Sequence, residues 1–284
     1  MIDELPDIQN TEPLIKLPIQ ECGVQNVEVP FKLESRDGQC YNDMVAKVSM
    51  RAYVPKNIKG VSMSRFILTL KDYLNKPLKH KLINEILMDL RRNINSSKSY
   101  LKFEFKLPVV KKSPISKNEF PIYYNCMFEA QSFPILKFKF FQCVTVQYSS
   151  YCPCSAELSK DLIGKGFDMG FPHAQRSFAK ILIQTIDPNI VWLEDIIDIV
   201  ENSVKTLPYP IIKRIDEQEI SKIASQNPIF VEDACRLISI GLNNNESIYD
   251  WIIKCTHQES IHTSDAIAIN WKGIKGGFDG RYYL

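Results

Sequence analysis

The sequence predicts an α+β fold of two similar units, each with an antiparallel sheet backed by helices. Three observations carry this prediction. Apolar and polar residues alternate in several short stretches, which is typical of strands, and between them apolar residues recur at helical spacing. The order strand-strand-helix-helix-strand-strand then appears once in each half of the 284 residues, without a visible repeat of sequence.

An extended arm is predicted for residues 1–22, where prolines and acidic residues interrupt any regular pattern. The first unit is expected over residues 23–132. Asp37-Gly38 is a strong signal for a hairpin turn between its first two strands. In chain order we expect strands at 27–33 and 46–54, helices at 62–70 and 78–90, and strands at 101–107 and 122–128.

The second unit is expected over residues 133–284 and repeats the order. Its predicted elements are strands near 135–148 and 175–186, helices near 191–205 and 217–242 with a break at Asn227-Pro228, and strands at 249–257 and 264–271. A further short helix is expected over Ala156 to Ile163. Single sheets with edges and an open face usually need partners, so we expect a homo-oligomer.

Composition and charge narrow the class of protein. The 35 basic and 33 acidic residues nearly balance, which gives no support for a nucleic-acid-binding surface. The N-terminus lacks a signal-peptide pattern, and no apolar run reaches the roughly 20 residues that a membrane span needs. We therefore expect a cytoplasmic protein without membrane contact, whose eight cysteines are free thiols or metal ligands rather than disulfides.

One pair of motifs points to metal chemistry. Cys152-Pro153-Cys154-Ser155 directly follows a predicted strand, and His173 opens the next strand. If these strands are hairpin partners, their ends meet, and a thiolate beside an imidazole makes half of a tetrahedral metal site. The alternative interpretation is two buried cysteines and a hydrogen-bonded structural histidine.

Three more charged motifs are ambiguous by themselves. Lys213-Arg214-Ile215-Asp216-Glu217 has the composition of a solvated charged turn. The acids of Phe230-Val231-Glu232-Asp233 begin a predicted helix, where they complement the helix dipole. Glu259-Ser260-Ile261-His262 lies between the last two predicted strands.

Taken together and in order, these motifs resemble those of the type IB GTP cyclohydrolase family. The resemblance covers about residues 5 to 271, and seven motifs in one order make it specific. The motifs are Pro6-Asp7-Ile8-Gln9-Asn10-Thr11, Met63-Ser64-Arg65-Phe66, Cys152-Pro153-Cys154-Ser155, His173-Ala174-Gln175-Arg176-Ser177, Lys213-Arg214-Ile215-Asp216-Glu217, Asn227-Pro228-Ile229-Phe230-Val231-Glu232-Asp233 and Glu259-Ser260-Ile261-His262.

The resemblance implies a fold, an activity and a cofactor. It implies two tandem tunnelling-fold units, each ββααββ, assembled as a homotetramer. It also implies a divalent metal ion, zinc or manganese with iron as a further candidate, and conversion of GTP to formate and 7,8-dihydroneopterin triphosphate, the first step of folate and tetrahydropterin biosynthesis.

Residue roles follow from the same resemblance. The implied metal ligands are Cys152, His173, Glu217 and His262. The implied catalytic groups are Cys152, Cys154, Glu259 and His262, with Glu259 a candidate for proton transfer. Glu232 is expected to accept hydrogen bonds from the guanine edge. The expected partners of the triphosphate are Arg65, Arg176, Lys213 and Arg214.

The chain departs from the family pattern in one extended segment. Residues 160–172 form a longer connection than expected, with glycines and apolar residues at Gly164, Gly166, Phe167, Met169, Gly170 and Phe171. We interpret this segment as a flap over bound GTP, and the alternative is a surface loop without a role. In addition, His173-Ala174-Gln175-Arg176 replaces the usual His-Asn-Gln-Arg, and Ser264-Asp265 stands where the family often has a second histidine.

Three other functions remain open at the level of sequence. An archaeal-type relative uses ferrous iron to make a cyclic phosphate product from GTP and would share the ligands. A tunnelling-fold oxidoreductase acting on a deazapurine nitrile would use a cysteine nucleophile and NADPH, which leaves Glu217 and His262 without a purpose. A non-catalytic purine- or pterin-binding oligomer would keep Glu232 and need no metal.

Overall fold

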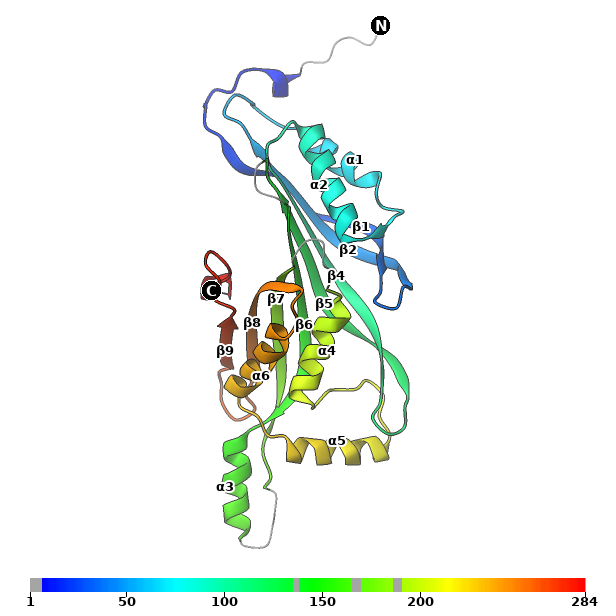
Figure 1. Ribbon diagram of the computed structural model, residues 1–284, viewed down its shortest axis with the longest axis vertical. Coiled ribbons are helices and arrows are strands. Elements are labelled where there is room, and N and C mark those ends of the chain that lie inside the picture. Colours follow the sequence, from blue (N-terminus) through cyan, green and yellow to red (C-terminus); the bar gives the residue numbers. More distant parts are fainter. Residues whose placement is uncertain (1–6, 135–137, 165–169, 186–190, 284) are drawn as a thin grey trace. The chain divides into compact units, whose positions relative to one another are not determined.

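The computed structural model describes residues 7–134, 138–164, 170–185 and 191–283. The strands follow the hydrogen-bonded order β3-β1-β2-β4-β5-β6-β7-β8-β9. The chain divides into two compact units: residues 1–106 with 127–141, and residues 107–126 with 142–284. Figure 1 shows the strands and the helices that lie against them.

The first unit is built on a long hairpin. Strands β1 (Ile19–Glu34) and β2 (Cys40–Val54) pair antiparallel, and Gly38 adopts a φ of 80° in the turn between them, as Asp37-Gly38 predicts. The other elements that lie wholly or partly in this unit are the 3-10 helix η1 (Ile8–Asn10), α1 (Met63–Lys71), β3 (Pro77–Leu78), α2 (His80–Ile94), β4 (Ser99–Lys112), β5 (Glu119–Ser132) and the start of β6 (Lys139–Tyr151).

Apolar residues of this unit meet between its sheet and its helices. Every second residue of β2 from Met44 to Val54 is buried, and the buried residues of α2 recur three or four positions apart. Helix α2 ends at Asn95, which adopts a left-handed conformation and donates its N–H to the last turn. The two expected helices therefore both form, and the alternation of the strands places one face in the core.

Strand β1 begins earlier than the sequence predicts. It starts at Ile19, inside the stretch expected to be an extended arm. Register shifts between Ile19 and Cys22 and between Val24 and Val27 interrupt the regular pairing, and Asn26 adopts a positive φ of 59°. Such bulges break the alternation of apolar and polar residues, so the pattern could not reveal the first part of this strand.

The second unit carries three more long strands, a short edge strand and four helices. Its elements are β6 (Lys139–Tyr151), α3 (Pro153–Ile163), β7 (Ala174–Thr185), α4 (Leu193–Val204), α5 (Arg214–Gln226), α6 (Val231–Asn243), β8 (Ile248–Gln258) and β9 (Ala266–Trp271). Figure 1 shows α4 and α6 side by side over the strands of this unit. The expected helical stretch at 217–242 is two helices, and the break falls at Asn227-Pro228 as predicted.

A buried carboxylate joins the β4–β5 hairpin to the start of α5. The backbone N–H groups of Ile115 and Ser116 donate to Asp216 Oδ1 at 2.9 and 2.8 Å, and the N–H of Lys213 donates to Oδ2 at 2.8 Å. Burial opposes ionisation of this carboxylate, but these bonds and one from the Ser116 hydroxyl outweigh it and hold the pKa of Asp216 well below its usual range. The first turn of α5 is thereby fixed.

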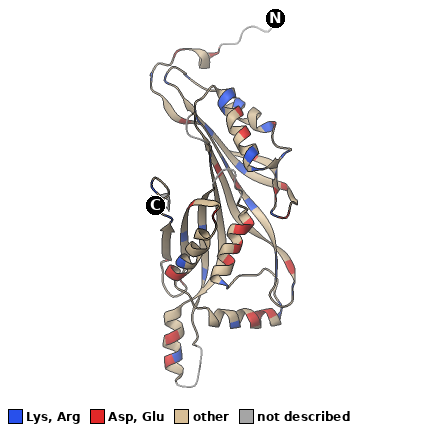
Figure 2. Cartoon of the chain, viewed as in Figure 1, with Lys and Arg blue, Asp and Glu red and all other residues tan. Residues whose placement is uncertain are grey.

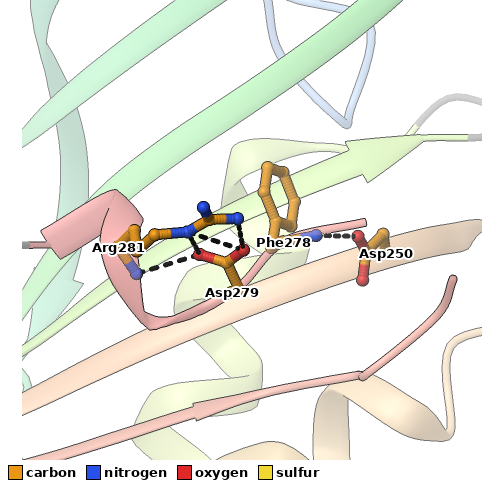
Figure 3. A network of polar contacts seen from close by, with 4 residues as sticks. All are labelled: Asp250, Phe278, Asp279 and Arg281. Atoms are coloured by element: carbon orange, nitrogen blue, oxygen red, sulfur yellow. Dashed lines mark hydrogen bonds and ion pairs between the residues drawn. The ribbon is translucent and has the colours of Figure 1, made fainter. Parts of the chain in front are cut away.

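A second carboxylate anchors the C-terminal segment to β8. Asp250 is buried, and its Oδ2 accepts a hydrogen bond of 2.7 Å from the N–H of Phe278, as Figure 3 shows. In the same segment, Arg281 Nε donates to both carboxylate oxygens of Asp279 at 3.0 and 3.1 Å. The described chain therefore ends in an ordered turn against the sheet.

Charges are distributed without a dominant sign. Figure 2 shows acidic and basic residues interspersed along α3 and α5. Within the described ranges, no helix is both long enough and apolar enough to cross a membrane.

Candidate active site

A cavity of about 390 Å³ lies in the second unit, where β6 and β8 end and β7, α3 and α6 begin. A volume of several hundred cubic ångströms is typical of small-molecule sites. Six of the residues singled out in the sequence line this cavity, namely Cys152, Cys154, His173, Glu232, Glu259 and His262.

The thiol and the first imidazole are brought together by the β6–β7 connection. The backbone N–H of Cys152 donates to the carbonyl oxygen of His173 at 3.3 Å, and the N–H of His173 donates to Ser155 Oγ at 3.1 Å. Cys152 is the N-cap residue of α3, and Pro153 occupies the first turn, where a missing N–H costs nothing. The expectation that these two strand ends meet is confirmed.

The loop after β8 completes one side of the cavity. Ser260 Oγ lies 3.2 Å from His173 Nδ1, and Glu259 and His262 flank this serine in sequence. With Nδ1 held by a hydroxyl, the Nε2 atom of His173 remains to serve as a ligand. Metal-binding histidines commonly have their second ring nitrogen fixed in this way.

The start of α6 forms the opposite side. The N–H of Ile229 donates to the carbonyl oxygen of Tyr151 at 2.9 Å, which ties the segment before α6 to the end of β6. Helix α6 begins at Val231, so Glu232 lies in its first turn, where the helix dipole favours a carboxylate. Glu232 is exposed to the cavity, and its side chain is free to meet a ligand.

A buried network of hydrogen-bonded polar side chains lies behind the cavity and was not predicted from the sequence. Ser150 Oγ is at its centre, 2.7 Å from Gln175 Oε1, 2.8 Å from Ser177 Oγ and 3.2 Å from His257 Nδ1. The other ring nitrogen of His257 lies 2.9 Å from the Tyr148 hydroxyl. Gln175 and His257 also line the cavity.

Burial determines the charge state of His257. His257 is only 2% exposed, and desolvation lowers its pKa to about 4, although the nearby carboxylates of Glu259 and Glu232 act in the opposite direction. His257 is therefore neutral near pH 7. The sequence does contain a signal for the burial of Ser150, Gln175 and His257. Each alternates in step with the apolar residues of its strand, so its side chain lies on the face that points into the core.

Glu217, a predicted metal ligand, does not line the cavity. It lies exposed in the first turn of α5, next to Asp216. Glu217 and Gln226 are separated by about 14 Å along the helix axis at 1.5 Å per residue. The far end of α5 leads to Ile229 and the cavity, so Glu217 lies at the remote end of this helix.

The four predicted triphosphate contacts also lie outside the cavity lining. Arg176 is exposed and follows Gln175 on β7, so its side chain leaves the opposite face of the strand. Lys213 and Arg214 begin α5 and are exposed. Arg65 belongs to α1 in the first unit, where its guanidinium donates to the carbonyl oxygen of Asn93 at 3.4 Å.

The donor chemistry of the cavity fits a borderline transition-metal ion. Cysteine sulfur and histidine nitrogen are the ligands that Zn²⁺ prefers in proteins. Among the residues that the structure describes, however, no three His, Cys, Asp or Glu side chains converge closely enough to hold a metal ion. The metal site therefore stays a prediction.

The 160–172 segment is tied to α3 at both of its described ends. Residues 160–163 extend that helix, and residues 165–169 lie outside the described ranges. On the return side, the N–H of Phe171 donates to Ser159 Oγ at 2.6 Å. A Cβ atom at Gly170 would lie 1.8 Å from the carbonyl oxygen of Ala156, so the backbone here requires glycine. The flap interpretation stays a prediction.

Fold and cavity together define an α+β protein with a polar small-molecule site between strand ends and helix N-termini. Solved structures share the fold: urate oxidase from Bacillus sp. TB-90, with a TM-score of 0.52 and 8% identity over 89% of this chain and 99% of that chain, and uricase from Arthrobacter globiformis, with a TM-score of 0.50 and 5% identity over 92% and 96%. This likeness concerns the fold alone and confirms the predicted tunnelling-fold class.

Sequence comparison identifies the family. The family model for type I GTP cyclohydrolase FolE2 matches residues 5–268. The chain is 33% identical to GTP cyclohydrolase FolE2 of Pseudothermotoga lettingae, over 93% of this chain and 97% of that protein. It is 31% identical to the protein of the same name from Thermosipho melanesiensis, over 93% and 96%. The chain belongs to the type I GTP cyclohydrolase FolE2 family.

Proposed function

We propose that this protein is a metal-dependent GTP cyclohydrolase that opens the imidazole ring of GTP and releases formate and 7,8-dihydroneopterin triphosphate. The observation that supports this activity most is one cavity lined by two thiols, three imidazoles and two carboxylates. The reaction needs all of these chemical types, because carbon 8 of GTP is a poor electrophile and proton transfers accompany ring opening.

Cys152, His173 and His262 would hold the divalent ion from this cavity. When bound, such an ion supplies Lewis acidity and an activated water nucleophile near neutral pH. The 3.2 Å contact between Ser260 Oγ and His173 Nδ1 orients one of these ligands before the ion arrives. The chain itself contributes a fixed imidazole and a thiol at a helix N-terminus.

The carboxylates have separate roles in this proposal. Glu232 accepts hydrogen bonds from the N1–H and 2-amino groups of guanine, and its place in the first turn of α6 leaves it accessible in the cavity. Glu259 is half-buried beside the ligand loop and moves protons to and from the opening ring. Cys154 lies in the first turn of α3 at the cavity wall.

Glu217 joins the site from a second copy of the chain in this proposal. Its own helix carries it to the far end of α5, and the cation-rich start of that helix, Lys213 and Arg214, accompanies it. A copy that delivers Glu217 to the cavity of a neighbour would deliver these cations as well, near the expected position of the triphosphate. Such a shared site requires a homo-oligomer, which we expect to be a tetramer.

Mixing two inactive variants tests this arrangement. Cys152→Ala and Glu217→Ala should each lack activity alone, because each removes one ligand from every site. Subunit exchange between them should restore part of the activity, because some mixed interfaces then contain an intact set. Mixing Cys152→Ala with His173→Ala, whose changes fall in one cavity, should restore nothing. Equal behaviour of both mixtures would exclude the shared site.

The proposed activity itself is tested by metal add-back. Protein stripped with a chelator should not consume GTP, and adding zinc, manganese or ferrous iron should restore a fluorescent pterin after oxidation. Chromatography of the product separates 7,8-dihydroneopterin triphosphate from a cyclic phosphate. Full turnover by the metal-free protein would contradict the proposal.

A further inference from the structure

The hydrogen bonds of the buried polar side chains behind the cavity have a defined direction of donation. Gln175 Oε1 can only accept, so the single proton of Ser150 is donated to it across 2.7 Å. The Ser177 hydroxyl and His257 Nδ1–H must then donate to Ser150 Oγ, since its own proton is committed. Ser150 thereby makes three hydrogen bonds and has no further capacity.

This direction of donation continues through the histidine. With the proton on Nδ1, the Nε2 atom of neutral His257 accepts from the Tyr148 hydroxyl at 2.9 Å. Tyr148, Ser150 and Ser177 are fully buried, so water does not compete for these bonds. If the amide of Gln175 were turned over, its nitrogen would donate to Ser150 Oγ, and the Ser150 proton would have to be donated to Ser177 instead. The orientation of the amide is therefore coupled to the direction of the hydrogen bond between the two serines.

The remaining half of the amide faces the cavity. Gln175 is only 6% exposed and lines the cavity together with Glu232 and Glu259. No acceptor within the described part of the chain contacts its Nε2 atom, while Oε1 is held by Ser150. An N–H donor that is nearly buried and unpaired gains free energy when a ligand supplies the missing acceptor.

We propose that Gln175 is a specificity-determining residue that donates from its amide nitrogen to the 6-carbonyl oxygen of the guanine base, and that Ser150 is its positioning residue. This inference rests on the proposed function, in which Glu232 accepts from N1–H and the 2-amino group. The carbonyl oxygen is the next atom along the same edge of guanine. A carboxylate and a correctly turned amide together match the donor-donor-acceptor pattern of that edge, whereas adenine presents an amino donor at position 6 and is rejected.

Two analogues separate the contributions of the two side chains. In 6-thio-GTP the carbonyl oxygen is replaced by sulfur, a weak acceptor, while N1–H and the 2-amino group remain. Inosine triphosphate keeps the carbonyl oxygen and lacks the 2-amino group. We expect the wild-type enzyme to prefer GTP over 6-thio-GTP by about tenfold or more in kcat/KM.

Gln175→Met should bring the GTP to 6-thio-GTP ratio close to one and leave the GTP to inosine triphosphate ratio unchanged. Glu232→Gln should bring the GTP to inosine triphosphate ratio close to one and leave the GTP to 6-thio-GTP ratio unchanged. Ser150→Ala should lower the 6-thio ratio by raising KM for GTP more than it lowers kcat, because the freed amide loses its orientation. Ser99→Ala removes an equally buried serine hydroxyl, bonded to the carbonyl oxygen of Leu87 at 2.9 Å, and should change neither ratio.

The outcomes distinguish this inference from the proposed function. A folded Gln175→Met enzyme with an unchanged 6-thio ratio overturns the role of Gln175 and leaves the cyclohydrolase activity standing. If the wild type binds GTP in calorimetry without opening it, the proposed function fails, and the ratio of dissociation constants for GTP and 6-thio-GTP still decides the role of Gln175. A wild-type protein that binds neither nucleotide overturns both.

Discussion

The backbone N–H of Cys152 donates to the carbonyl oxygen of His173 across 3.3 Å, and this bond closes the connection between β6 and β7. It places a thiol and an imidazole, separated in sequence by α3 and the 160–172 segment, at one wall of the same cavity. The paired strand ends therefore keep the two side chains together.

Replacing Cys152 by alanine should abolish metal binding. The variant removes the only sulfur ligand in the proposed set, and even outer partners of metal ligands contribute about 10- to 100-fold. We expect activity to fall at least about a hundredfold, with metal content measured by atomic emission falling in parallel. Cys40→Ala, at an exposed position in β2, is the matched control and should retain both. A metal-loaded, active Cys152→Ala protein would remove Cys152 from the ligand set.

Gly170→Ala should displace His173 through the backbone. The added methyl carbon would lie 1.8 Å from the carbonyl oxygen of Ala156, so the segment that returns from the 160–172 connection must move away from α3. We expect weaker metal affinity in a titration, with the fold retained in circular dichroism. At Gly60 the nearest atom to an added methyl is 3.5 Å away, so Gly60→Ala is a harmless comparison. Equal metal affinity of both variants would show that the close approach is unimportant.

The buried histidine should make stability depend on pH in a defined window. The pKa of His257 is lowered to about 4 from an ordinary value of 6.5, so between these values the unfolded chain binds a proton that the folded protein does not. The free energy of unfolding should therefore decrease as pH falls from 6.5 towards 4, by up to about 3 kcal/mol. Above pH 6.5 this group has no effect.

Denaturant unfolding across that pH range provides the measurement. His257→Gln should show a flatter profile between pH 6.5 and 4, because the titrating group is gone. His262→Gln, at an exposed position, should keep the wild-type profile. If the two variants give the same profile, His257 does not titrate as proposed.

The carboxylate of Asp216 should stabilise the second unit at pH values at which it is ionised. Its pKa is held well below the usual range, so the stabilisation is present above about pH 4 and is lost as the pH falls further. Asp216→Asn should lower Tm at pH 7 by a few degrees. Because one amide oxygen cannot accept all the bonds that Asp216 receives, the β4–β5 hairpin should loosen in hydrogen exchange.

Asp161→Asn, an exposed change on α3, serves as the reference for loss of one negative charge. The difference in Tm between Asp216→Asn and the wild type should shrink at low pH, where the wild-type carboxyl is itself protonated. A difference that stays constant down to low pH would mean that the charge of Asp216 contributes nothing.

Local pattern predicted the elements of the fold because it reports which face of each segment is buried. The helix break at Asn227-Pro228 and the turn at Asp37-Gly38 were visible for the same reason, since both are set by backbone preferences of a few residues. The start of β1 was missed because bulges near Cys22 and Asn26 disturb the alternation on which the prediction depends.

The part of the candidate site that one pair of adjacent strands creates could be predicted from the sequence. The part that several elements build together could not. Adjacent strand ends brought Cys152 and His173 together, and this needed only the strand order. The hydroxyl of Ser150 meets Gln175 and His257 from three neighbouring strands, and a polar residue at a core position gives no hint of its partner. The distance of Glu217 from the cavity depends on the direction in which α5 runs, and the spacing of apolar residues does not predict that direction.

Release of carbon 8 from GTP is the most direct measurement of the central claim. GTP labelled at carbon 8 should give labelled formate and 7,8-dihydroneopterin triphosphate in equal amounts when incubated with the metal-loaded protein, and Glu232→Gln should produce much less of both at the same nucleotide concentration. Folded, metal-loaded, oligomeric protein that leaves the label in the purine ring would contradict the assignment of GTP ring opening to this cavity.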